Sequence, residues 1–240
     1  MRNKIDLFIQ KLQLLGINIS SQQIEQFVMF YKMMIDKNKV MNLTSVTEPE
    51  EVIDKHFIDS LALKRVYDLN RNISIIDVGT GAGFPGIPLK IIFPDIQIVL
   101  LDSLNKRIKF LNEVVDTLDL KGVRCIHERS EDAARDKKYR ESFDLCVSRA
   151  VANLSTLSEL CIPFIKVGGS FISYKAGNSK QEIEEADGAV KKLGGRIKNI
   201  TEFVLPDTEF DRVFVEIEKI KNTAGKYPRK AGMPSKQPLK

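Results

Sequence analysis

From residue 73 onward, short apolar runs rich in β-branched residues alternate with amphipathic helical patterns. The first five runs cover residues 73–78, 96–101, 122–126, 143–147 and 169–174. Strands that alternate with helices build a parallel sheet, because each helix returns the chain to the start of the next strand. Right-handed crossovers place helices on both faces of that sheet. The alternation therefore predicts a doubly wound α/β fold.

The end of the predicted sheet differs from its beginning. Two further strand-like runs, 196–205 and 212–220, are joined by a loop containing Pro206 and Asp207 that is too short to hold a helix. Two strands so close in sequence pair as an antiparallel hairpin. We therefore expect seven strands, mostly parallel, ending in that hairpin.

The residues before the sheet have helical periodicity. One helix is predicted by the apolar spacing of Ile5, Phe8, Ile9, Leu12 and Leu15. Ser20 with Gln23, and Thr47 with Glu50, match the capping-box pattern and predict two more helix starts. We expect three parts: a helical N-terminal subdomain (1–70), a sheet domain (71–221) and a C-terminal tail (222–240).

A glycine-rich loop, Asp77 to Gly86 (DVGTGAGFPG), follows the first strand and opens a helix. Glycines allow the sharp turn and let backbone N–H groups approach a ligand closely. Gly81, Gly83 and Gly86 also match the dinucleotide pattern G-x-G-x-x-G. Asp102, at the end of the second strand, can accept both hydroxyls of a ribose, in NAD or in S-adenosylmethionine. The loop therefore predicts a nucleotide-type ligand.

Three features favour S-adenosylmethionine over NAD. Asp77 ends the first strand, where a carboxylate suits a sulfonium or ammonium group and opposes a pyrophosphate. The antiparallel hairpin at the end of the sheet is typical of methyltransferases. Only about 70 helical residues precede the loop, which leaves little room for the substrate domain of a dehydrogenase. An NAD-dependent oxidoreductase remains the alternative.

Six ordered segments across nearly the whole chain resemble one known family, the bacterial ribosomal RNA small subunit methyltransferase G family, also called glucose-inhibited division protein B. The segments are Asn42-Leu43-Thr44, His56 to Leu61, Asp77 to Gly86, Arg129-Ser130-Glu131, Ser148 to Ala152 and Tyr227 to Leu239. The resemblance implies a Rossmann-like class I methyltransferase that uses S-adenosylmethionine. It also implies methylation of a guanine N7 in a decoding-region loop of 16S rRNA.

Chemistry in a doubly wound sheet gathers where the parallel strands end. The cofactor-binding residues that we expect there are Asp77, Gly79, Gly81, Gly83, Phe84, Asp102, Ser103, Ser130, Glu131 and Arg149. Arg149 can clamp the donor carboxylate or an RNA phosphate through its planar guanidinium, the alternative being a structural ion pair. The family varies at Phe84 and Ser130, so contacts there are expected through backbone. The Glu131 carboxylate could instead be solvated.

The chain lacks the usual devices for proton transfer or covalent catalysis. No Asn/Asp-Pro-Pro-aromatic motif follows the fourth strand, and Cys146 lies within that strand. Guanine N7 carries a lone pair and no proton, so it can attack a methyl carbon that is held in line. We therefore expect no acid/base catalytic residue. His56, Asp59 and Ser60 lie on one helix without a G-x-S-x-G turn, which excludes a hydrolase triad and leaves their role open.

The positive charge of the chain is concentrated at its C-terminal end. Residues 219–240 hold seven of the 37 Lys and Arg and none of the 32 Asp and Glu, so residues 1–218 have a net charge of −2. Such a tail suits RNA or the small ribosomal subunit as a partner, the alternative being a solvated end. The expected RNA contacts are Lys226, Tyr227, Arg229, Lys230 and Lys236, on an extended strap with Tyr227 free to stack on a base. A noncatalytic RNA-binding protein with a vestigial donor site is a further alternative.

Several classes of protein are disfavoured by what the sequence lacks. No apolar run approaches the roughly 20 residues of a membrane span. Residues 1–16 do not resemble a secretory signal, so we expect a cytoplasmic protein. Three cysteines without C-x-x-C spacing and two histidines predict neither a metal site nor a disulfide framework. We take a monomer as the working expectation, and the residues do not distinguish naked RNA from a partly or fully assembled subunit as substrate.

Overall fold

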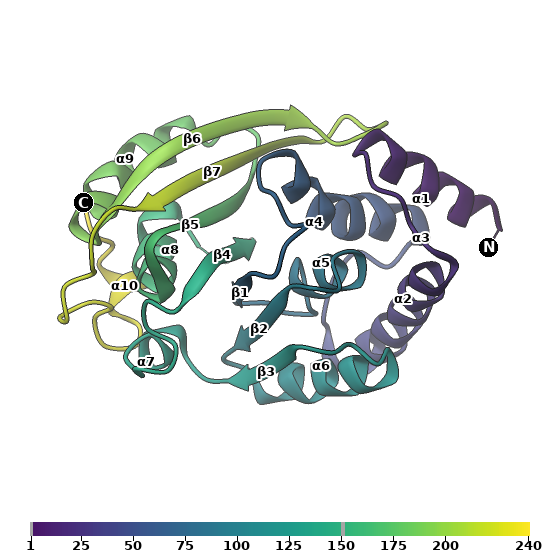
Figure 1. Ribbon diagram of the computed structural model, residues 1–240, viewed down its shortest axis with the longest axis horizontal. Helices are drawn as coiled ribbons and strands as arrows, with labels where there is room; N and C mark the ends of the chain where they lie inside the picture. Colours follow the sequence, from purple (N-terminus) through teal and green to yellow (C-terminus); the bar gives the residue numbers. More distant parts are fainter. Residues whose placement is uncertain (1, 150–151) are drawn as a thin grey trace.

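In a computed structural model, which describes residues 2–149 and 152–240, the chain forms one seven-stranded sheet between two groups of helices (Figure 1). The strand order is β3-β2-β1-β4-β5-β7-β6. The strands are β1 (Ser74–Val78), β2 (Gln97–Asp102), β3 (Val123–His127), β4 (Phe143–Arg149), β5 (Ile165–Ala176), β6 (Gly195–Val204) and β7 (Asp211–Lys219). β1 to β5 pair in parallel, whereas β7 is antiparallel to both β5 and β6. The expected doubly wound sheet with a final hairpin is confirmed.

Most of the helices lie where the amphipathic patterns of the sequence predicted them. The α-helices are α1 (Arg2–Leu14), α2 (Ser21–Met41), α3 (Pro49–Val52), α4 (Asp59–Leu61), α5 (Gly86–Ile92), α6 (Asn105–Thr117), α7 (Ser130–Ala133), α8 (Leu154–Cys161), α9 (Lys180–Lys192) and α10 (Met233–Lys236). A π-helix (Ile53–Ile58) joins α3 to α4, and 3-10 turns follow at Ala62–Arg65 and Ile162–Phe164. None of the helices in the described residues is long and apolar enough to cross a membrane.

One of the two predicted capping boxes is present. Ser20 caps α2, since its Oγ accepts from the Gln23 backbone N–H at 3.2 Å and the Gln23 side chain accepts from the Ser20 N–H at 2.9 Å. The prediction of a capping box at Thr47 is wrong. Helix α3 begins at Pro49, and Glu48 occupies the N-cap position without a side-chain hydrogen bond to the helix. Proline is favoured at a first helical position, where its missing N–H costs nothing, and this sets the start of α3.

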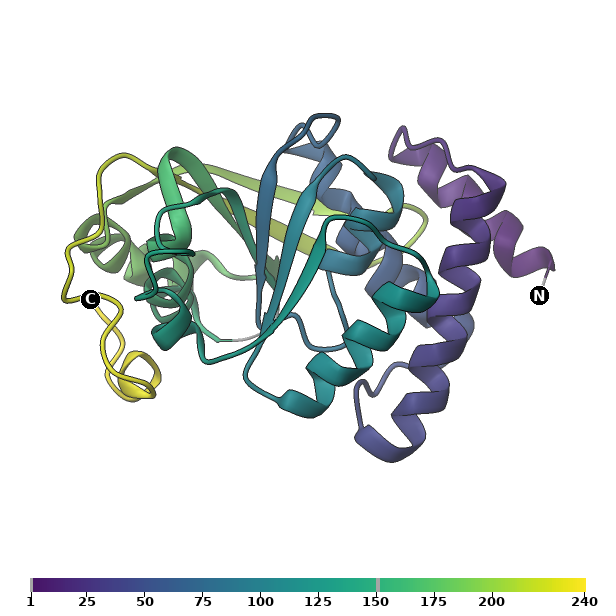
Figure 2. The same cartoon turned by 60° about the horizontal axis from the view of Figure 1, so that its bottom comes forward.

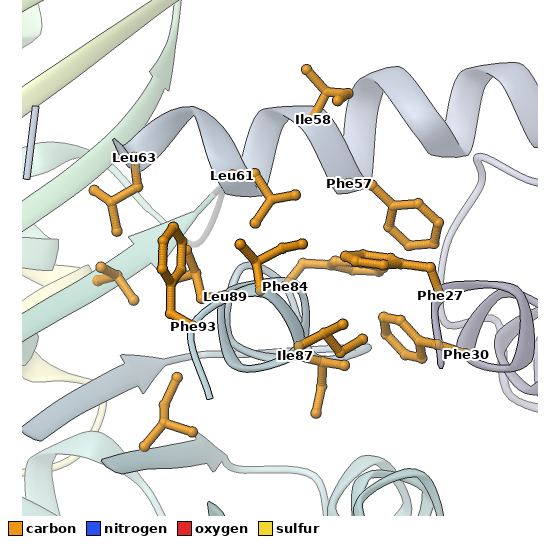
Figure 3. Close-up of a cluster of buried hydrophobic side chains, with 14 of the residues drawn as sticks. Phe27, Phe30, Phe57, Ile58, Leu61, Leu63, Phe84, Ile87, Leu89 and Phe93 are labelled. Carbon is orange, nitrogen blue, oxygen red and sulfur yellow. The ribbon is translucent and has the colours of Figure 1, made fainter. Parts of the chain in front are cut away.

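The helices before the sheet share a hydrophobic core with one sheet face. α2 packs on α5 and α6, as the purple and teal helices of Figure 2 show. Phe27, Phe30, Phe57 and Phe84 meet in the middle of this core (Figure 3), and the Phe30 and Phe84 ring centroids lie 5.3 Å apart. Full burial of one such side chain contributes about 1.5 to 3 kcal/mol. This aromatic cluster therefore attaches the N-terminal helices firmly to the glycine loop that carries Phe84.

The C-terminal tail, yellow in Figure 1, folds back beside α7 and α8 rather than extending as a strap. The expectation that Tyr227 is free to stack on a base differs from the structure, in which Tyr227 is buried. Arg229 binds the fully buried Glu159, with Nη2 donating to Oε2 at 2.7 Å and Nε to Oε1 at 3.0 Å. A buried carboxylate needs such a partner, and this holds the tail in place. Lys226, Lys230 and Lys236 remain exposed.

Candidate functional site

The glycine loop turns sharply between β1 and α5. Gly79, Gly81 and Gly83 have φ values of 73°, 62° and 100°, which side chains rarely adopt. A Cβ on Gly83 would lie 2.7 Å from Ile87 and 2.9 Å from Leu111, so this glycine is required for packing of the helices. Among the described residues, a Cβ on Gly81 would instead meet only the Gly79 carbonyl, at 4.0 Å. Gly81 therefore borders open space into which a ligand can approach the backbone.

Asp77 lies beneath the loop and not on its ligand side. Its Oδ2 accepts from the Thr80 hydroxyl at 2.7 Å and from the Gly86 N–H at 2.9 Å. Burial raises the pKa of the Asp77 carboxyl to about 7, and Oδ1 has no hydrogen-bond partner among the described residues. The structure thus uses Asp77 to hold the loop, whereas the sequence suggested a position beside a cationic ligand group.

Asp102 lies beside the loop, at the end of β2. Its Oδ2 accepts from the Gly81 N–H at 3.0 Å and from Arg107 Nη1 at 3.2 Å, and its Oδ1 accepts from the Leu104 N–H at 2.9 Å. A carboxylate offers about four acceptor sites, so three of them are used and one remains. The side chain is held rigidly at the cavity wall with capacity to accept a ligand hydroxyl.

A cavity of about 390 Å³ opens between this loop and the N-terminal helices. Its lining residues are Leu43, Thr44, His56, Gly79, Thr80, Gly81, Ala82, Phe84, Asp102, Ser103, Arg107 and Arg149. The volume is in the range of small-molecule sites. The backbone clearance at Gly81 and the carboxylate of Asp102 fit a ribose-containing ligand such as S-adenosylmethionine.

The structure brings together most of the donor-binding residues that the sequence predicted. Six of them line the cavity: Gly79, Gly81, Phe84, Asp102, Ser103 and Arg149. Asp77 and Gly83 support the loop from behind. Sequence reasoning missed Thr44, Arg107 and the position of His56 in the wall. The quoted segments Asn42-Leu43-Thr44 and His56 to Leu61 contained the signal for two of these, without showing that both segments face the glycine loop.

Arg149 ends β4 and is held in the wall by the π-helix that follows α3 and by the first residue of α4. Its Nη1 donates to Asp59 Oδ2 at 2.8 Å and to the Lys55 carbonyl at 2.9 Å. The guanidinium carbon lies 5.2 Å from the centre of the Phe84 ring. Arg149 therefore forms the structural ion pair considered from the sequence and also lines the cavity, whereas its role as a clamp for a ligand stays a prediction.

His56 completes the same wall. Its ring stacks on Phe84 with centroids 4.5 Å apart, and Nε2 lies 2.9 Å from the Thr44 hydroxyl. Burial, together with the positive charge of Arg149, lowers the pKa of His56 to about 4. The imidazole is therefore neutral at physiological pH and contributes an aromatic ring with polar nitrogens to the cavity wall.

Ser130 and Glu131 direct their side chains away from the cavity. The Ser130 hydroxyl donates to the Leu160 carbonyl at 2.6 Å, and the Glu131 carboxylate accepts from the Gly232 N–H at 2.8 Å. Glu131 is buried, so the alternative of a solvated carboxylate is wrong. Any contact of this segment with a ligand in the cavity is left to its backbone.

The segment after β4 is described in part. The Ser148 hydroxyl donates to the Val78 carbonyl at 2.8 Å and so ties β4 to β1, whereas Ala150 and Val151 lie outside the described residues. Cys146 is fully buried within β4, does not line the cavity, and burial raises the pKa of its thiol. It is not placed to act as a nucleophile, as expected.

Several solved structures share this fold. TYW2 of M. jannaschii, solved in complex with AdoMet, has a TM-score of 0.51 and 18% identity, covering 63% of this chain and 71% of that chain. A geranyl diphosphate C-methyltransferase from Streptomyces coelicolor, solved with S-adenosyl-L-homocysteine, has a TM-score of 0.52 and 12% identity, covering 68% and 78%. At such low identity the likeness is one of fold.

Curated relatives are much more similar in sequence. The Ribosomal RNA small subunit methyltransferase G of Lachnoclostridium phytofermentans is 50% identical over 232 residues, which cover 97% of this chain and 96% of the relative. The protein of the same name from Clostridium kluyveri is 51% identical over 226 residues, or 94% of each chain. The family model for rRNA small subunit methyltransferase G matches residues 23–210. With this cavity, this fold and this similarity, the chain belongs to the rRNA small subunit methyltransferase G family.

Proposed function

We propose that this protein transfers the methyl group of S-adenosylmethionine to N7 of a guanine in 16S rRNA. Family membership supports a small-subunit rRNA methyltransferase over the NAD-dependent oxidoreductase and the noncatalytic RNA-binding protein. The resemblance noted in the sequence supports a target in a decoding-region loop. We further propose that the protein acts as a monomer in the cytoplasm.

The donor site that we propose is the cavity of about 390 Å³ at the glycine loop. The remaining acceptor site of Asp102 suits a ribose hydroxyl, with Ser103 beside it, and the open side of Gly81 admits the ligand to the backbone of the loop. We assign Arg149 to the donor carboxylate, because its guanidinium lines the cavity and binds carboxylates well. Asp77 and Gly83 contribute by shaping the loop, and Ser130 and Glu131 through their backbone.

Bound in this cavity, S-adenosylmethionine supplies a methyl group on a positively charged sulfur. The residues of the chain hold and align the reactants: the stacked rings of His56 and Phe84 form a wall, and the Arg149 guanidinium lies over the Phe84 ring and beside His56 Nδ1. Phe84 is buried and His56 and Arg149 are partly buried, which limits the access of water to this side of the site. Alignment and a preorganised electrostatic environment are the main contributions expected of such a site.

The observation that carries the choice of guanine N7 is the chemistry of the cavity wall. A useful general base has a pKa near the working pH, yet the pKa of His56 is lowered to about 4. The Asp102 carboxylate already accepts three hydrogen bonds. Among the described lining residues nothing else is suited to remove a proton. An acceptor atom with a lone pair and no proton, such as guanine N7, needs no such group.

Recognition of the RNA is assigned in part to the tail. Lys226, Lys230 and Lys236 are exposed and can pair with phosphates, whereas Arg229 and Tyr227 hold the tail on the body. Phosphate contacts of this kind supply affinity without sequence specificity.

The proposal is tested by mapping N7-methylguanine in 16S rRNA. Reduction followed by strand cleavage marks each N7-methylated position, in RNA from cells with and without this protein. We expect one position that depends on the protein and is restored by adding it with the donor to unmethylated small subunits. An identical cleavage pattern in both RNAs, with none gained on addition, would contradict the proposal.

A further inference from the structure

Asp59 lies at the start of α4 and is almost fully buried, with 4% of its surface exposed. Each of its two carboxylate oxygens binds a different arginine. Oδ2 accepts from Arg149 Nη1 at 2.8 Å, and Oδ1 accepts from Arg212 Nε at 2.6 Å. A buried carboxylate is costly unless its charge and its lone pairs are satisfied, and here two guanidiniums provide this.

The three residues come from separate parts of the chain. Arg149 ends β4 and pairs in register with Tyr174 of β5, while Arg212 on β7 pairs with Ala176 at the end of β5. The Tyr174 hydroxyl also donates to the Ser60 carbonyl at 2.9 Å, next to Asp59. The carboxylate is therefore fixed between the start of α4, the ends of β4 and β5 and the start of β7.

The two arginines differ in their relation to the cavity. Arg149 lines it, and its hydrogen bonds to Asp59, the Lys55 carbonyl and His56 Nδ1 all come from one stretch of five sequence positions, Lys55 to Asp59. Arg212 does not line the cavity, and its Nη1 donates to the Asp211 carbonyl at 2.9 Å. Asp59 thus connects a cavity residue to a charge outside the cavity.

We propose that Asp59 is a positioning residue for methyl transfer, which acts through Arg149 and is itself held in place by Arg212. Without the carboxylate, the Arg149 guanidinium loses the ion pair that fixes its plane against Phe84. Two guanidiniums would then repel each other across the position that Asp59 occupies. This role rests on the proposed function, because it concerns the site assigned to the reaction.

The test is a double-mutant cycle on the single-turnover rate of methyl transfer, measured with the protein and the donor in excess over the small subunits. Asp59→Asn keeps the shape of the side chain and removes its charge, and we expect the rate to fall by about 10- to 100-fold, as for misplaced reacting groups. Arg149→Gln is expected to lose at least as much. If Asp59 acts through Arg149, the double variant is no slower than Arg149→Gln, to within about twofold.

A second variant covers the case in which Asp59→Asn does not fold. Arg212→Gln removes only the arginine that binds Asp59 from outside the cavity. We expect a smaller loss of rate than for Asp59→Asn, and we expect no further loss when Arg212→Gln is added to Arg149→Gln. Glu218→Gln is the matched control, because it breaks the exposed ion pair with Arg196 on the same β6–β7 hairpin. This control should keep the wild-type rate.

The outcomes separate the two proposals. The rate losses of two single variants could multiply in the double variant, or the rate of each variant could fall only in step with its melting temperature. Either result would show a structural role and overturn the positioning role of Asp59. A wild-type rate in both Asp59→Asn and Arg212→Gln would also overturn it. If the wild-type protein and the Glu218→Gln control do not methylate the subunits, the proposed function fails instead.

Discussion

Glu159 on α8 is completely buried and binds Arg229 of the C-terminal tail through both carboxylate oxygens. The Arg229 backbone N–H donates to the same carboxylate at 2.7 Å. This ion pair connects the tail to the helix that follows the donor-site strand β4. The tail is thus part of the folded body, and its role in RNA binding must be tested without removing it.

Replacing Arg229 should destabilise the protein. Arg229→Met leaves the Glu159 carboxylate buried without its counter-charge, and breaking a buried pair costs about 3 to 5 kcal/mol. Unfolding in urea measures the loss. Arg196→Gln, which breaks the exposed pair with Glu218, should change the free energy of unfolding by no more than about 1 kcal/mol. Equal effects of the two substitutions would contradict the importance of the tail contact.

The exposed lysines of the tail should govern the salt dependence of RNA binding. Changing Lys226, Lys230 and Lys236 to Gln removes three phosphate contacts, so the slope of log affinity against log salt should become shallower by about 2 to 3. Donor affinity, measured by calorimetry, should not change, because none of the three lines the cavity.

The control for this series removes the same charge elsewhere. Lys180 and Lys191 on α9 and Lys121 after α6 are exposed, and changing these three to Gln should leave most of the slope intact. A slope that responds equally to both triple variants would indicate a general charge effect and not a contact made by the tail.

Asp102→Ala should weaken binding of S-adenosylmethionine by about 1.5 to 3 kcal/mol, the usual value of hydrogen bonds to a charged group. The substitution removes the acceptor of the Gly81 and Leu104 N–H groups, which is also the acceptor that we propose for a ribose hydroxyl. Calorimetric titration of the folded variant measures the change. Unchanged affinity in a protein with a wild-type melting curve would reject Asp102 as a ribose acceptor.

The partly buried His56 and the buried Asp77 should give opposite pH dependences of stability. The pKa of His56 is lowered to about 4 in the folded state, so the unfolded state binds more protons below its ordinary pKa of about 6.5, and stability falls as the pH decreases from 6.5 to 4. The pKa of Asp77 is raised to about 7, so its contribution is present at low pH and is lost as the pH rises toward 7.

Substitution should separate these opposing contributions. Relative to the wild type, His56→Gln should gain stability as the pH is lowered from 6.5 to 4, and Asp77→Asn should gain stability as the pH is raised from 4 to 7. Each change is on the order of 3 kcal/mol, from about 1.4 kcal/mol for one unit of pKa. Parallel stability curves for the wild type and both variants would refute the perturbed pKa values.

The sequence predicted the sheet well because each strand is a short apolar run with a clear end. It also predicted the Ser20 cap, since a capping box involves residues only three positions apart. β5 begins at Ile165, earlier than the expected residue 169, because a register irregularity beside Phe143 adds a segment with exposed residues. Exposed residues carry no apolar pattern by which such a segment could be recognised.

The site was predicted less completely than the fold because its contacts join distant positions. The place of the glycine loop and of Asp102 in the site could be predicted, because ligands bind where parallel strands end. Thr44 lines the cavity beside His56, twelve positions further along the chain, and Arg229 binds Glu159, seventy positions before it. Counting charges along the tail could not show which cation a buried acid would bind.

The central claim, methyl transfer to guanine N7 without a proton-transferring residue, is tested most directly by removing the N7 atom. Small subunits are reconstituted with 16S rRNA in which 7-deazaguanine replaces guanine, and labelled methyl incorporation from S-adenosylmethionine is compared with that of subunits containing ordinary guanine. RNA binding in both samples serves as the control. We predict that the 7-deaza subunits bind the protein but receive no methyl group. Methyl incorporation into them at the ordinary rate would contradict the account.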